Sequence, residues 1–365
     1  MSNASSHDFF IGTYTKDGSR GIYATRLDAR SGALSSPSLA AETANPNFLA
    51  SSPRGEFLYA LQEVCTPEGK PGGGVSAFTI DPTTRALAPL NSVATGGASV
   101  SHLALDATQR MLIAVSYGGG YIVSFALLAD GRIGTPSRLI AQKGQLGPNP
   151  TRQDRPHPHS VTLSPDQRFA LVADLGLDAV FSYRVDAAAA TLTPNDPPFA
   201  RCTPGCGPRH GAFSRDGRFF YVLGEIDGSV TACTYDTASG EVKPFQHITT
   251  LPPGFKVADS DRAAEVRVHP NGRFLYASNR GHDSIAVFAV DAATGALTTV
   301  ELTPCGGKAP RNFALTADGA WLVCAHQDSG TLCSFSVNPA TGKLIRVPGV
   351  VHVPQAVCVL GLRSM

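Results

Sequence analysis

Apolar and polar residues alternate in short segments along the whole chain, and these segments follow one order. A residue such as Gly or Asp opens an alternating strand, an Asp or Asn turn follows, and a second strand comes after the turn. Alternation with a period of two, bounded by turn residues, predicts β-strands joined in hairpins. This unit occurs seven times, at residues 21–34, 74–87, 120–133, 178–192, 228–242, 283–297 and 330–344. Consecutive units start 46 to 58 residues apart, a period that fits one four-stranded propeller blade with its loops.

A second recurring block precedes the last six units. Its clearest copy reads SPRGEFLYA at residues 52–60, related copies start at residues 164, 214, 269 and 316, and the copy at residue 106 is degraded. A polar turn followed by apolar alternation predicts a tight hairpin with one buried face. In the first kind of unit, a short carboxylate or amide is expected to accept hydrogen bonds from its own turn; these residues are Asp28, Asp81, Asp186, Asp236, Asp291 and Asn338.

The two ends of the chain complement each other. The first unit lacks an upstream block, and PQAVCV at residues 354–359 resembles the inner-strand segments PRNFAL and PRHGAF without having a unit of its own. We predict that this tail pairs with strands at residues 9–14, 22–28 and near 34–41, which leaves no open sheet edge. The sequence therefore predicts an all-β, seven-bladed β-propeller closed by N- and C-terminal strands that share one blade. Residues 9–365 would be a single domain after a disordered leader at residues 1–8.

Composition limits the partners. The formal net charge is +1 and no run of Lys or Arg occurs, so neither nucleic acid nor an anionic membrane is an expected partner. No apolar stretch reaches the roughly 18 residues that span a bilayer, and the strand pattern starts by Phe9, which predicts a cytoplasmic protein without a secretory leader. Cys202 and Cys206 form the closest cysteine pair. They lack a second pair at ligand spacing, so no metal or other cofactor is expected.

Candidate site residues emerge when the repeats are aligned. Equivalent positions of a propeller converge at one end of the central channel, because the inner strands all start there. The positions five and four residues before the turn block hold Asn47/Phe48, Ser101/His102, His159/Ser160, Arg209/His210, Ala264/Glu265 and Arg311/Asn312. The position eight residues after the turn glycine or its replacement holds Glu63, Tyr117, Leu175, Glu225, Arg280 and Gln327, with Asn279 and His326 just before the last two.

These positions predict a cationic cup that contains carboxylates. Such a cup suits an anionic substrate and proton transfer, because Arg binds carboxylate or phosphate through a fork of donors while Glu or His moves a proton near neutral pH. The alternative interpretation is that the same groups only hydrogen-bond one another around a wet channel. His269, at a turn position, is expected to lie on the solvated surface.

Longer motifs carry a family resemblance. They are GPNPTRQ at residues 147–153 with PHPHSV at 156–161, GPRH at 207–210 and SNRGHDS at 278–284. With these motifs the chain resembles the seven-bladed lactonase family, which includes propeller-type 6-phosphogluconolactonases and the fungal carboxymuconate-cyclising enzyme. The resemblance extends from GTYT at residues 12–15 to the tail at 354–359. It implies the propeller fold and a site that handles lactones.

The resemblance also implies catalytic residues. In the cyclising enzyme the proposed group is a His, a Glu and Arg residues at the channel mouth, and the motifs place these at His159, Glu225, Arg209 and Arg280, with His157 as the competitor of His159. The alignment of repeats selects the same positions. The expected substrate-binding residues are His102, His157, His210, Asn279, Arg311, Gln327, His326, Tyr117 and Glu63.

The sequence departs from the family pattern at two places. Ser101-His102 stands where Pro-Cys-His is expected, and Ala325-His326-Gln327 stands where Ala-Asn-Gln is usual. We therefore expect His326 to influence the choice of substrate.

The expected activity is hydrolysis of a small anionic lactone. The leading candidate substrate is 6-phosphogluconolactone or a related aldonolactone. Glu225 would activate water, the arginines would stabilise the oxyanion, and His159 would protonate the leaving ring oxygen. Two alternatives stay open: a carboxymuconate cyclase or cycloisomerase that uses the same groups, and a ligand-binding propeller without enzymatic activity. Arg binds phosphate and carboxylate alike. The sequence alone therefore allows either one as the anionic group of the substrate.

Overall fold

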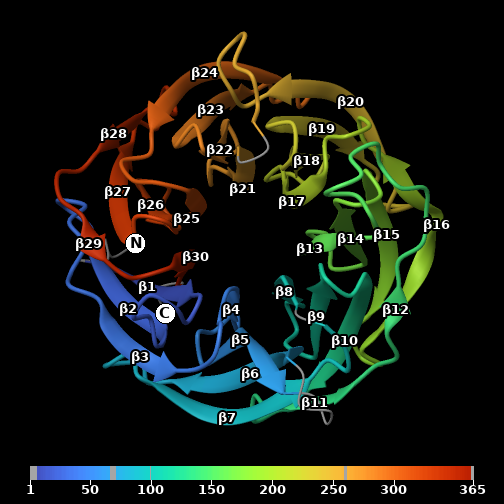
Figure 1. The fold of residues 1–365 in the computed structure, drawn as a ribbon, viewed down its shortest axis with the longest axis horizontal. Coiled ribbons are helices and arrows are strands. Elements are labelled where there is room, and N and C mark those ends of the chain that lie inside the picture. The colour runs from blue at the N-terminus through green and yellow to red at the C-terminus, as the bar shows by residue number, and fades with distance from the viewer. Residues whose placement is uncertain (1–5, 66–70, 99, 259–260, 363–365) are drawn as a thin grey trace.

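The computed structural model describes residues 6–65, 71–98, 100–258 and 261–362. These residues form strands and no helix, and no segment among them is a helix able to cross a membrane. Seven sheets surround a central axis (Figure 1). The prediction of a seven-bladed β-propeller is confirmed.

The first blade contains both ends of the chain. It has the order β3-β2-β1-β30, and its strands are β1 (Ser6–Thr13), β2 (Gly21–Asp28), β3 (Ser38–Glu42) and β30 (Ala356–Gly361). β1 runs antiparallel to β30, with Ile11 opposite Val359, so the predicted closure is confirmed. The predicted boundary of the leader is wrong, because β1 starts at Ser6: Asp8 is opposite Arg26 in the ladder, and its carboxylate pairs with Arg26 and Arg85. Residues 1–5 lie outside the described residues.

The next three blades are built from consecutive strands, each with its first strand nearest the axis (Figure 1). The second blade holds β4 (Leu49–Ser51), β5 (Phe57–Cys65), β6 (Pro71–Ile80) and β7 (Leu87–Ala94). The third holds β8 (His102–Leu105), β9 (Met111–Ser116), β10 (Tyr121–Leu127) and β11 (Ile133–Pro136), with β12 (Ile140–Ala141) also paired to β10. The fourth holds β13 (Pro158–Leu163), β14 (Phe169–Asp174), β15 (Ala179–Asp186) and β16 (Thr191–Arg201).

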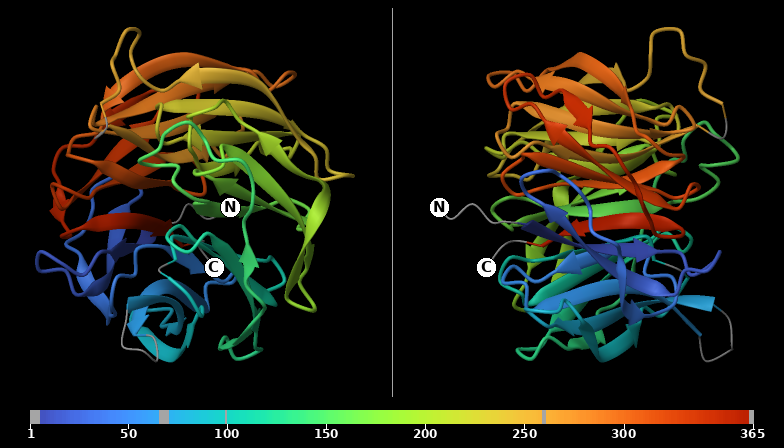
Figure 2. Two further views of the ribbon diagram at one scale, coloured as in Figure 1. Left: turned by 45° about the vertical axis from the view of Figure 1, so that its right-hand side comes forward. Right: turned by 90° about the vertical axis from the view of Figure 1, so that its left-hand side faces the viewer.

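The last three blades repeat this plan. The fifth holds β17 (Pro208–Phe213), β18 (Phe219–Gly224), β19 (Ser229–Tyr235) and β20 (Val242–Thr249). The sixth holds β21 (Arg262–Val268), β22 (Phe274–Arg280), β23 (Ser284–Val290) and β24 (Leu297–Pro304). The seventh holds β25 (Pro310–Leu315), β26 (Trp321–His326), β27 (Thr331–Val337) and β28 (Leu344–Arg346), with β29 (Val351–His352) also paired to β27. β1 begins and β30 ends at one face of the ring, and the loop between β20 and β21 projects from the other face (Figure 2).

The turn residues behave as predicted. The Oδ1 atom of each turn Asp or Asn accepts hydrogen bonds of 2.7–3.1 Å from the backbone N–H groups two and three residues later. These bonds fix the outer hairpin of six blades. The prediction for His269 is wrong: its side chain is 3% exposed, because it occupies the inward Ser or Thr position of the block and its Nε2 lies 3.0 Å from the Gly319 carbonyl.

The second recurring block joins each blade to the next. In the fifth blade, the Phe219 ring packs beneath the outer turn of the sixth at Gly295, where a Cβ atom would lie 2.4 Å from the ring. Arg218 stacks over Phe219 and donates to the Ala292 carbonyl of the same turn, while Tyr221 donates to the Gly295 carbonyl. Gly295 has a φ of 72°, so both its backbone and its surroundings require glycine.

Trp321 closes the ring at a second place. It holds the position of Phe219 in the seventh blade, and its ring packs against Gly32 of the first blade. Its indole N–H donates to the Ala29 carbonyl across 3.2 Å. The contact between the last and first blades therefore has the same form as the contacts inside the chain.

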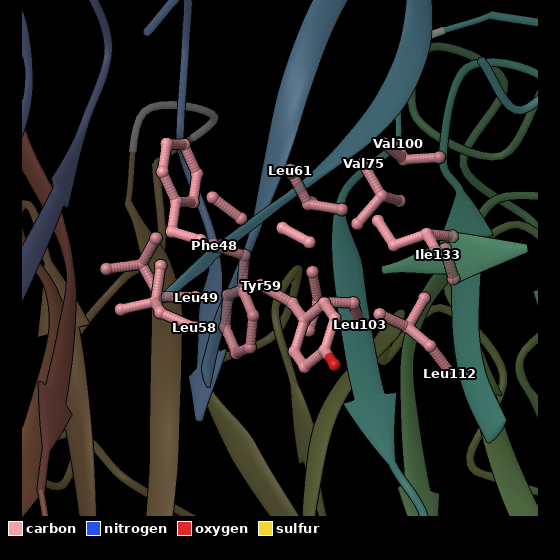
Figure 3. Packing of buried hydrophobic residues seen from close by; sticks show 14 of the residues in the cluster. Phe48, Leu49, Leu58, Tyr59, Leu61, Val75, Val100, Leu103, Leu112 and Ile133 are labelled. Atoms are coloured by element: carbon pink, nitrogen blue, oxygen red, sulfur yellow. The ribbon is translucent and has the colours of Figure 1, made fainter. Parts of the chain in front are cut away.

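Apolar side chains fill the space between neighbouring blades. Leu58 and Leu61 of β5 belong to one buried cluster with Leu103 and Leu112 of the third blade (Figure 3). Each fully buried leucine contributes about 1.5–3 kcal/mol. The blades are thus packed wedges, and they hold the ends of the inner strands in fixed positions around the axis.

Candidate active site

The inner strands surround a cavity of about 450 Å³, which is within the size range of small-molecule sites. We call this cavity the cup. Arg262, the first residue of β21, is part of its lining. Its lining residues are Tyr14, Asn47, Phe48, Val100, Ser101, Tyr117, Gly118, Arg152, His159, Arg209, His210, Glu225, Arg262, Arg280, Arg311, Asn312 and Val357.

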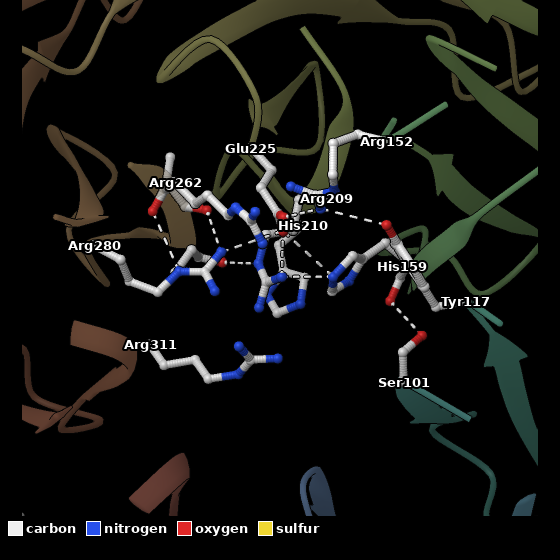
Figure 4. Close-up of polar contacts among 12 residues, drawn as sticks. Ser101, Tyr117, Arg152, His159, Arg209, His210, Glu225, Arg262, Arg280 and Arg311 are labelled. Carbon is white, nitrogen blue, oxygen red and sulfur yellow. Dashed lines mark hydrogen bonds and ion pairs between the residues drawn. The ribbon is translucent and has the colours of Figure 1, made fainter. Parts of the chain in front are cut away.

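Glu225 is at the centre of the polar contacts (Figure 4). It follows β18 directly, and its backbone N–H donates to Gly207 while its carbonyl accepts from Ala263. Arg152 donates to Oε1 across 2.5 Å, and Arg209 donates to Oε2 across 2.5 Å. Arg280 lies 3.3 Å from the same oxygen. The carboxylate, 2% exposed, is thus enclosed by cations.

The charge of Glu225 follows from this surrounding. Burial raises the pKa of the carboxyl, but the guanidinium groups of Arg209 and Arg280 lower it by more than burial raises it. His159 and Arg152 make smaller contributions in the same direction as the two arginines. The resulting pKa is well below the usual range. Glu225 is therefore ionised at neutral pH, as expected, but a carboxylate with so low a pKa is a weak base.

His159, on β13, is 3.6 Å from Oε2 of Glu225. Its Nε2 is 2.5 Å from Nη1 of Arg209; since a guanidinium only donates, this nitrogen accepts and Nδ1 carries the proton. Nδ1 is buried and has no partner among the described residues. Burial and the charge of Arg209 lower the pKa of His159 well below its ordinary value, so the imidazole is neutral at neutral pH.

Backbone carbonyls hold two of the arginines in place. Nε of Arg209 donates to Ala264 across 2.7 Å. Arg280 donates to the carbonyls of Arg262 and Ala263, each across 3.3 Å. These anchors on β21 aim both guanidinium groups at the cup, because each leaves terminal nitrogens directed inward.

Arg311 stands on the side of the cup away from Glu225 (Figure 4). It donates to the hydroxyl of Tyr14 across 3.0 Å and to Oε1 of Gln327 across 3.2 Å, which are both neutral groups. Five arginines and one glutamate line the cup, so the formal charge of its lining is +4. Such an excess of largely enclosed positive charge attracts an anionic ligand.

The structure brings most predicted residues together. Glu225, His159, Arg209, Arg280, His210, Arg311 and Tyr117 all line the cup. Gln327 does not line it but holds Arg311. Glu63 lines an adjoining cavity of about 240 Å³ that shares Tyr14 and Asn47 with the cup, and its carboxylate accepts from Asn45.

Four further residues predicted to bind substrate do not line the cup, and these predictions are corrected. His157 stacks on Tyr117 and lies between the Tyr117 carbonyl and Asp154, so it supports a lining residue instead. Asn279 bonds to Thr250, because it precedes Arg280 by one residue and the strand turns its side chain away. His102 lies beyond His210, towards the other end of the channel.

His326 is the fourth. It is fully buried, and its ring nitrogens lie 2.9 Å from the Cys305 carbonyl and 3.1 Å from the Thr331 carbonyl. It therefore fixes the loop between β24 and β25, and its expected influence on substrate choice has no support in its position.

Arg152 and Arg262 were missed by the alignment of repeats. Arg152 lies in the GPNPTRQ segment, a loop that the other blades lack; Gln153 pins this loop by donating to the Leu175 carbonyl and accepting from the N–H of Asn149. The resemblance of that motif was the available signal. Arg262 precedes the aligned positions of β21, so counting from the turn block passed over it.

The fold is an all-β propeller, and its axis holds an arginine-rich cup whose charge suits a small anion. The chain matches the family described as "Lactonase, 7-bladed beta-propeller" over residues 8–361. The chain belongs to this seven-bladed lactonase family.

Individual relatives cover almost the whole chain. It is 35% identical to a 6-phosphogluconolactonase of Bacillus subtilis, with 98% of each chain covered. It is 30% identical to a 6-phosphogluconolactonase of Formosa agariphila, covering 93% of this chain and 95% of the relative. The solved structure of a periplasmic gluconolactonase of Pseudomonas aeruginosa superposes with a TM-score of 0.90 at 30% identity, covering 98% of this chain and 99% of that one.

Proposed function

We propose that the protein hydrolyses 6-phosphogluconolactone or a closely related aldonolactone. One observation carries the proposal: five arginines and one carboxylate line a cup of about 450 Å³. A sugar lactone that bears a phosphate fits this charge, because the phosphate neutralises arginines that Glu225 alone leaves unbalanced. The names of the Bacillus and Formosa relatives support the same substrate.

The substrate would lie between two groups of arginines. Arg311, which has only neutral hydrogen-bond partners, is suited to bind the phosphate. Arg209 and Arg280 are suited to hold the lactone carbonyl and to stabilise the oxyanion that forms when water attacks, since they are fixed and desolvated. The lactone ring would then lie above His159 and His210.

Glu225 would act by holding these cations. Its oxygens are engaged by Arg152, Arg209 and Arg280, and its low pKa argues against the expected role in activating water. His159 is likewise neutral and gives its lone pair to Arg209, which argues against the expected role as proton donor to the leaving oxygen. Both residues stay in the proposed catalytic group as organisers of the arginines.

The test compares two lactones. Proton release would be followed for 6-phosphogluconolactone and for unphosphorylated gluconolactone, with the spontaneous rate subtracted. We expect higher kcat/KM for the phosphorylated lactone, and we expect Arg311→Gln to reduce this preference at least tenfold. Arg215→Gln is the matched control, because Arg215 is exposed at the turn after β17. Absence of lactone hydrolysis by the parent protein would refute the proposed function.

Cytoplasmic location stays a prediction from the sequence. The Pseudomonas relative is described as periplasmic. If this protein is cytoplasmic, the two relatives work in different compartments. Fractionation of the source cells with a compartment marker would test it.

A further inference from the structure

His210 has an unused lone pair in the floor of the cup. It lies on β17, and its Nδ1 is 3.1 Å from Oε2 of Glu265. Because the ionised carboxylate only accepts, Nδ1 carries the proton and Nε2 carries the lone pair. No hydrogen bond reaches Nε2 from the part of the chain that the structure describes, and Nε2 is not an enclosed unpartnered atom. His210 lines both the cup and a second cavity of about 190 Å³, and Glu265 lines only the second. Because Nδ1 faces Glu265, we infer that Nε2 faces the cup.

Glu265 is built to orient this imidazole. It is 1% exposed, and it also accepts from the side chain of Asn312 and from the N–H of Val266 across 2.9 Å. Burial raises the pKa of its carboxyl, but Arg267 and His210 bring it down to about 2. The carboxylate is thus fixed and charged at neutral pH.

Stability does not explain this pair. A buried charge costs several kcal/mol of desolvation, and replacing a buried polar pair by apolar residues is often neutral or stabilising. The pair nevertheless lies directly beneath the proposed reaction site. A carboxylate that fixes the tautomer of a histidine, with the second ring nitrogen facing a cavity, is the arrangement of a general base.

The ring of His210 cannot turn away from the cup. The rings of His102 and His159 meet it at centroid distances of 5.2 and 5.4 Å, and the ring of Phe48 does so at 5.9 Å. All three contacts are edge-to-face. The packing therefore holds Nε2 in one direction.

The other groups of the cup that can accept a proton are engaged. Arg209 occupies the lone pair of His159. The Tyr117 hydroxyl accepts from Arg152, and the Tyr14 hydroxyl accepts from Arg311. Glu225 is bound by three arginines.

Resting on the proposed function, we propose that His210 is the general base of lactone hydrolysis and that Glu265 is its positioning residue. Nε2 takes a proton from a water molecule as the water oxygen bonds to the lactone carbonyl carbon. The tetrahedral intermediate then collapses, the bond from carbon to ring oxygen breaks, and the protonated Nε2 gives its proton to that oxygen. The product acid ionises at neutral pH and releases one proton to solvent.

The electrostatic surroundings fit this cycle. Burial lowers the pKa of His210, Glu265 opposes that effect, and the charges of Arg209 and Arg267 add to it. The folded protein therefore holds the imidazole neutral, as a base must be. The groups that face it are Glu265, Arg209, Arg267, His102 and His159.

The test uses His210→Gln and Glu265→Gln in the full-length protein, with 6-phosphogluconolactone as the probe. His210→Gln should lower kcat on the order of a hundredfold or more with little change in KM. It should also abolish the acid limb of the pH profile of kcat/KM. Glu265→Gln should lower kcat and move that limb to lower pH, because the neutral amide no longer favours the imidazolium. A merely structural role of Glu265 would not move the limb.

The controls and outcomes distinguish a wrong assignment of His210 as the base from a wrong proposal of lactonase activity. His352→Gln and Glu241→Gln carry the same substitutions far from the cup, on β29 and in an outer turn, and should match the parent. Parent-like kcat in a folded His210→Gln protein would overturn the base assignment and leave the lactonase proposal intact. If either cup variant fails to fold, a kcat/KM profile of the parent that stays flat from neutral pH down to the lowest pH at which the protein remains folded would overturn it equally. A parent without lactone hydrolysis would refute the function and the base together.

Discussion

Arg152 donates to Oε1 of Glu225 across 2.5 Å, although the two residues are 73 positions apart in the chain. The contact joins the loop before β13 to the end of β18, so it bridges two blades over the edge of the cup. Arg152 also reaches the Tyr117 hydroxyl, 3.3 Å away, on a third blade. One side chain thus ties three blades together at the site.

Replacing Arg152 by Ala should loosen the site without unfolding the propeller. A charge-assisted hydrogen bond is worth about 1.5–3 kcal/mol, and its loss frees one oxygen of Glu225. We expect kcat/KM for 6-phosphogluconolactone to fall at least tenfold. Arg155→Ala in the same loop is the matched control, since Arg155 is exposed and, within the described part of the chain, forms an ion pair with Asp154 alone. Equal kinetics of both variants would contradict a role for Arg152.

Glu225→Gln removes the charge that gathers the arginines but keeps the shape. We expect turnover to fall on the order of a hundredfold, the scale of losing one electrostatic element of a site, with substrate binding largely retained. The acid limb of the pH profile should persist, because it belongs to His210. Disappearance of that limb in this variant would instead assign the base to Glu225.

Arg209→Lys and Arg280→Lys keep the charge but lose the fork of donors. Arg209 bridges Ala264, His159 and Glu225, a set that one ammonium group cannot reach together. We expect lower catalytic efficiency in both variants with unchanged thermal melting. Unchanged kinetics in both would show that neither guanidinium contacts the reacting groups.

Truncation after Val353 removes β30, the inner strand that pairs with β1, and so leaves the inner edge of β1 unpaired. Unpaired edges recruit other chains, so we expect aggregated or unfolded protein. Size-exclusion chromatography and a thermal melt would check this, with removal of residues 363–365 as the control. A soluble truncated protein that melts cooperatively near the parent temperature would refute the importance of the closing strand.

Asp174 should make the fold less stable as pH rises. Burial raises the pKa of this carboxyl from 3.8 to about 6, and its Oδ2 has no partner among the described residues. Since the folded state holds the proton more tightly, the contribution is fully present below pH 3.8 and is lost as pH rises through 6. A shift of this size corresponds to about 3 kcal/mol.

Asp174→Asn cannot lose that proton, so the stability of the variant relative to the parent should increase between pH 4 and pH 7 in urea unfolding. Asp236→Asn is the control, because backbone N–H groups lower the pKa of that turn carboxyl, so its contribution is lost only as pH falls below about 3.8 and the relative stability of this variant should change little between pH 4 and pH 7. The same pH trend in both variants would contradict the interpretation.

The fold was predictable because the same sequence pattern recurs in every blade. Alternation, turn residues and the leftover tail each follow from local rules, and the sheets form within a blade. The site was predictable to the extent that symmetry governs it: Glu225 and Arg280 occupy one repeat position and both face the axis. Alternation also explains the errors at Asn279, which precedes the cup residue Arg280, and at His326, which precedes Gln327, the residue that holds Arg311.

The remaining features depend on irregular backbone. The register of β17 shifts between Pro208 and Gly211, so Arg209 and His210 both line the cup although they are neighbours. No pattern of apolar residues encodes such a shift. Arg152 lies in a loop without counterparts in the other blades, and its distance from Glu225 in the chain gives no sign of their contact.

Trp321 is the single tryptophan of the chain, and it lies where the seventh blade meets the first. The protein therefore carries its own optical probe at the junction between the last and the first blade of the chain. Its emission should change when the two ends of the chain come together, so circularisation of the propeller can be timed in a stopped-flow instrument without any attached dye. The same signal would distinguish an open arc of folded blades from a completed ring.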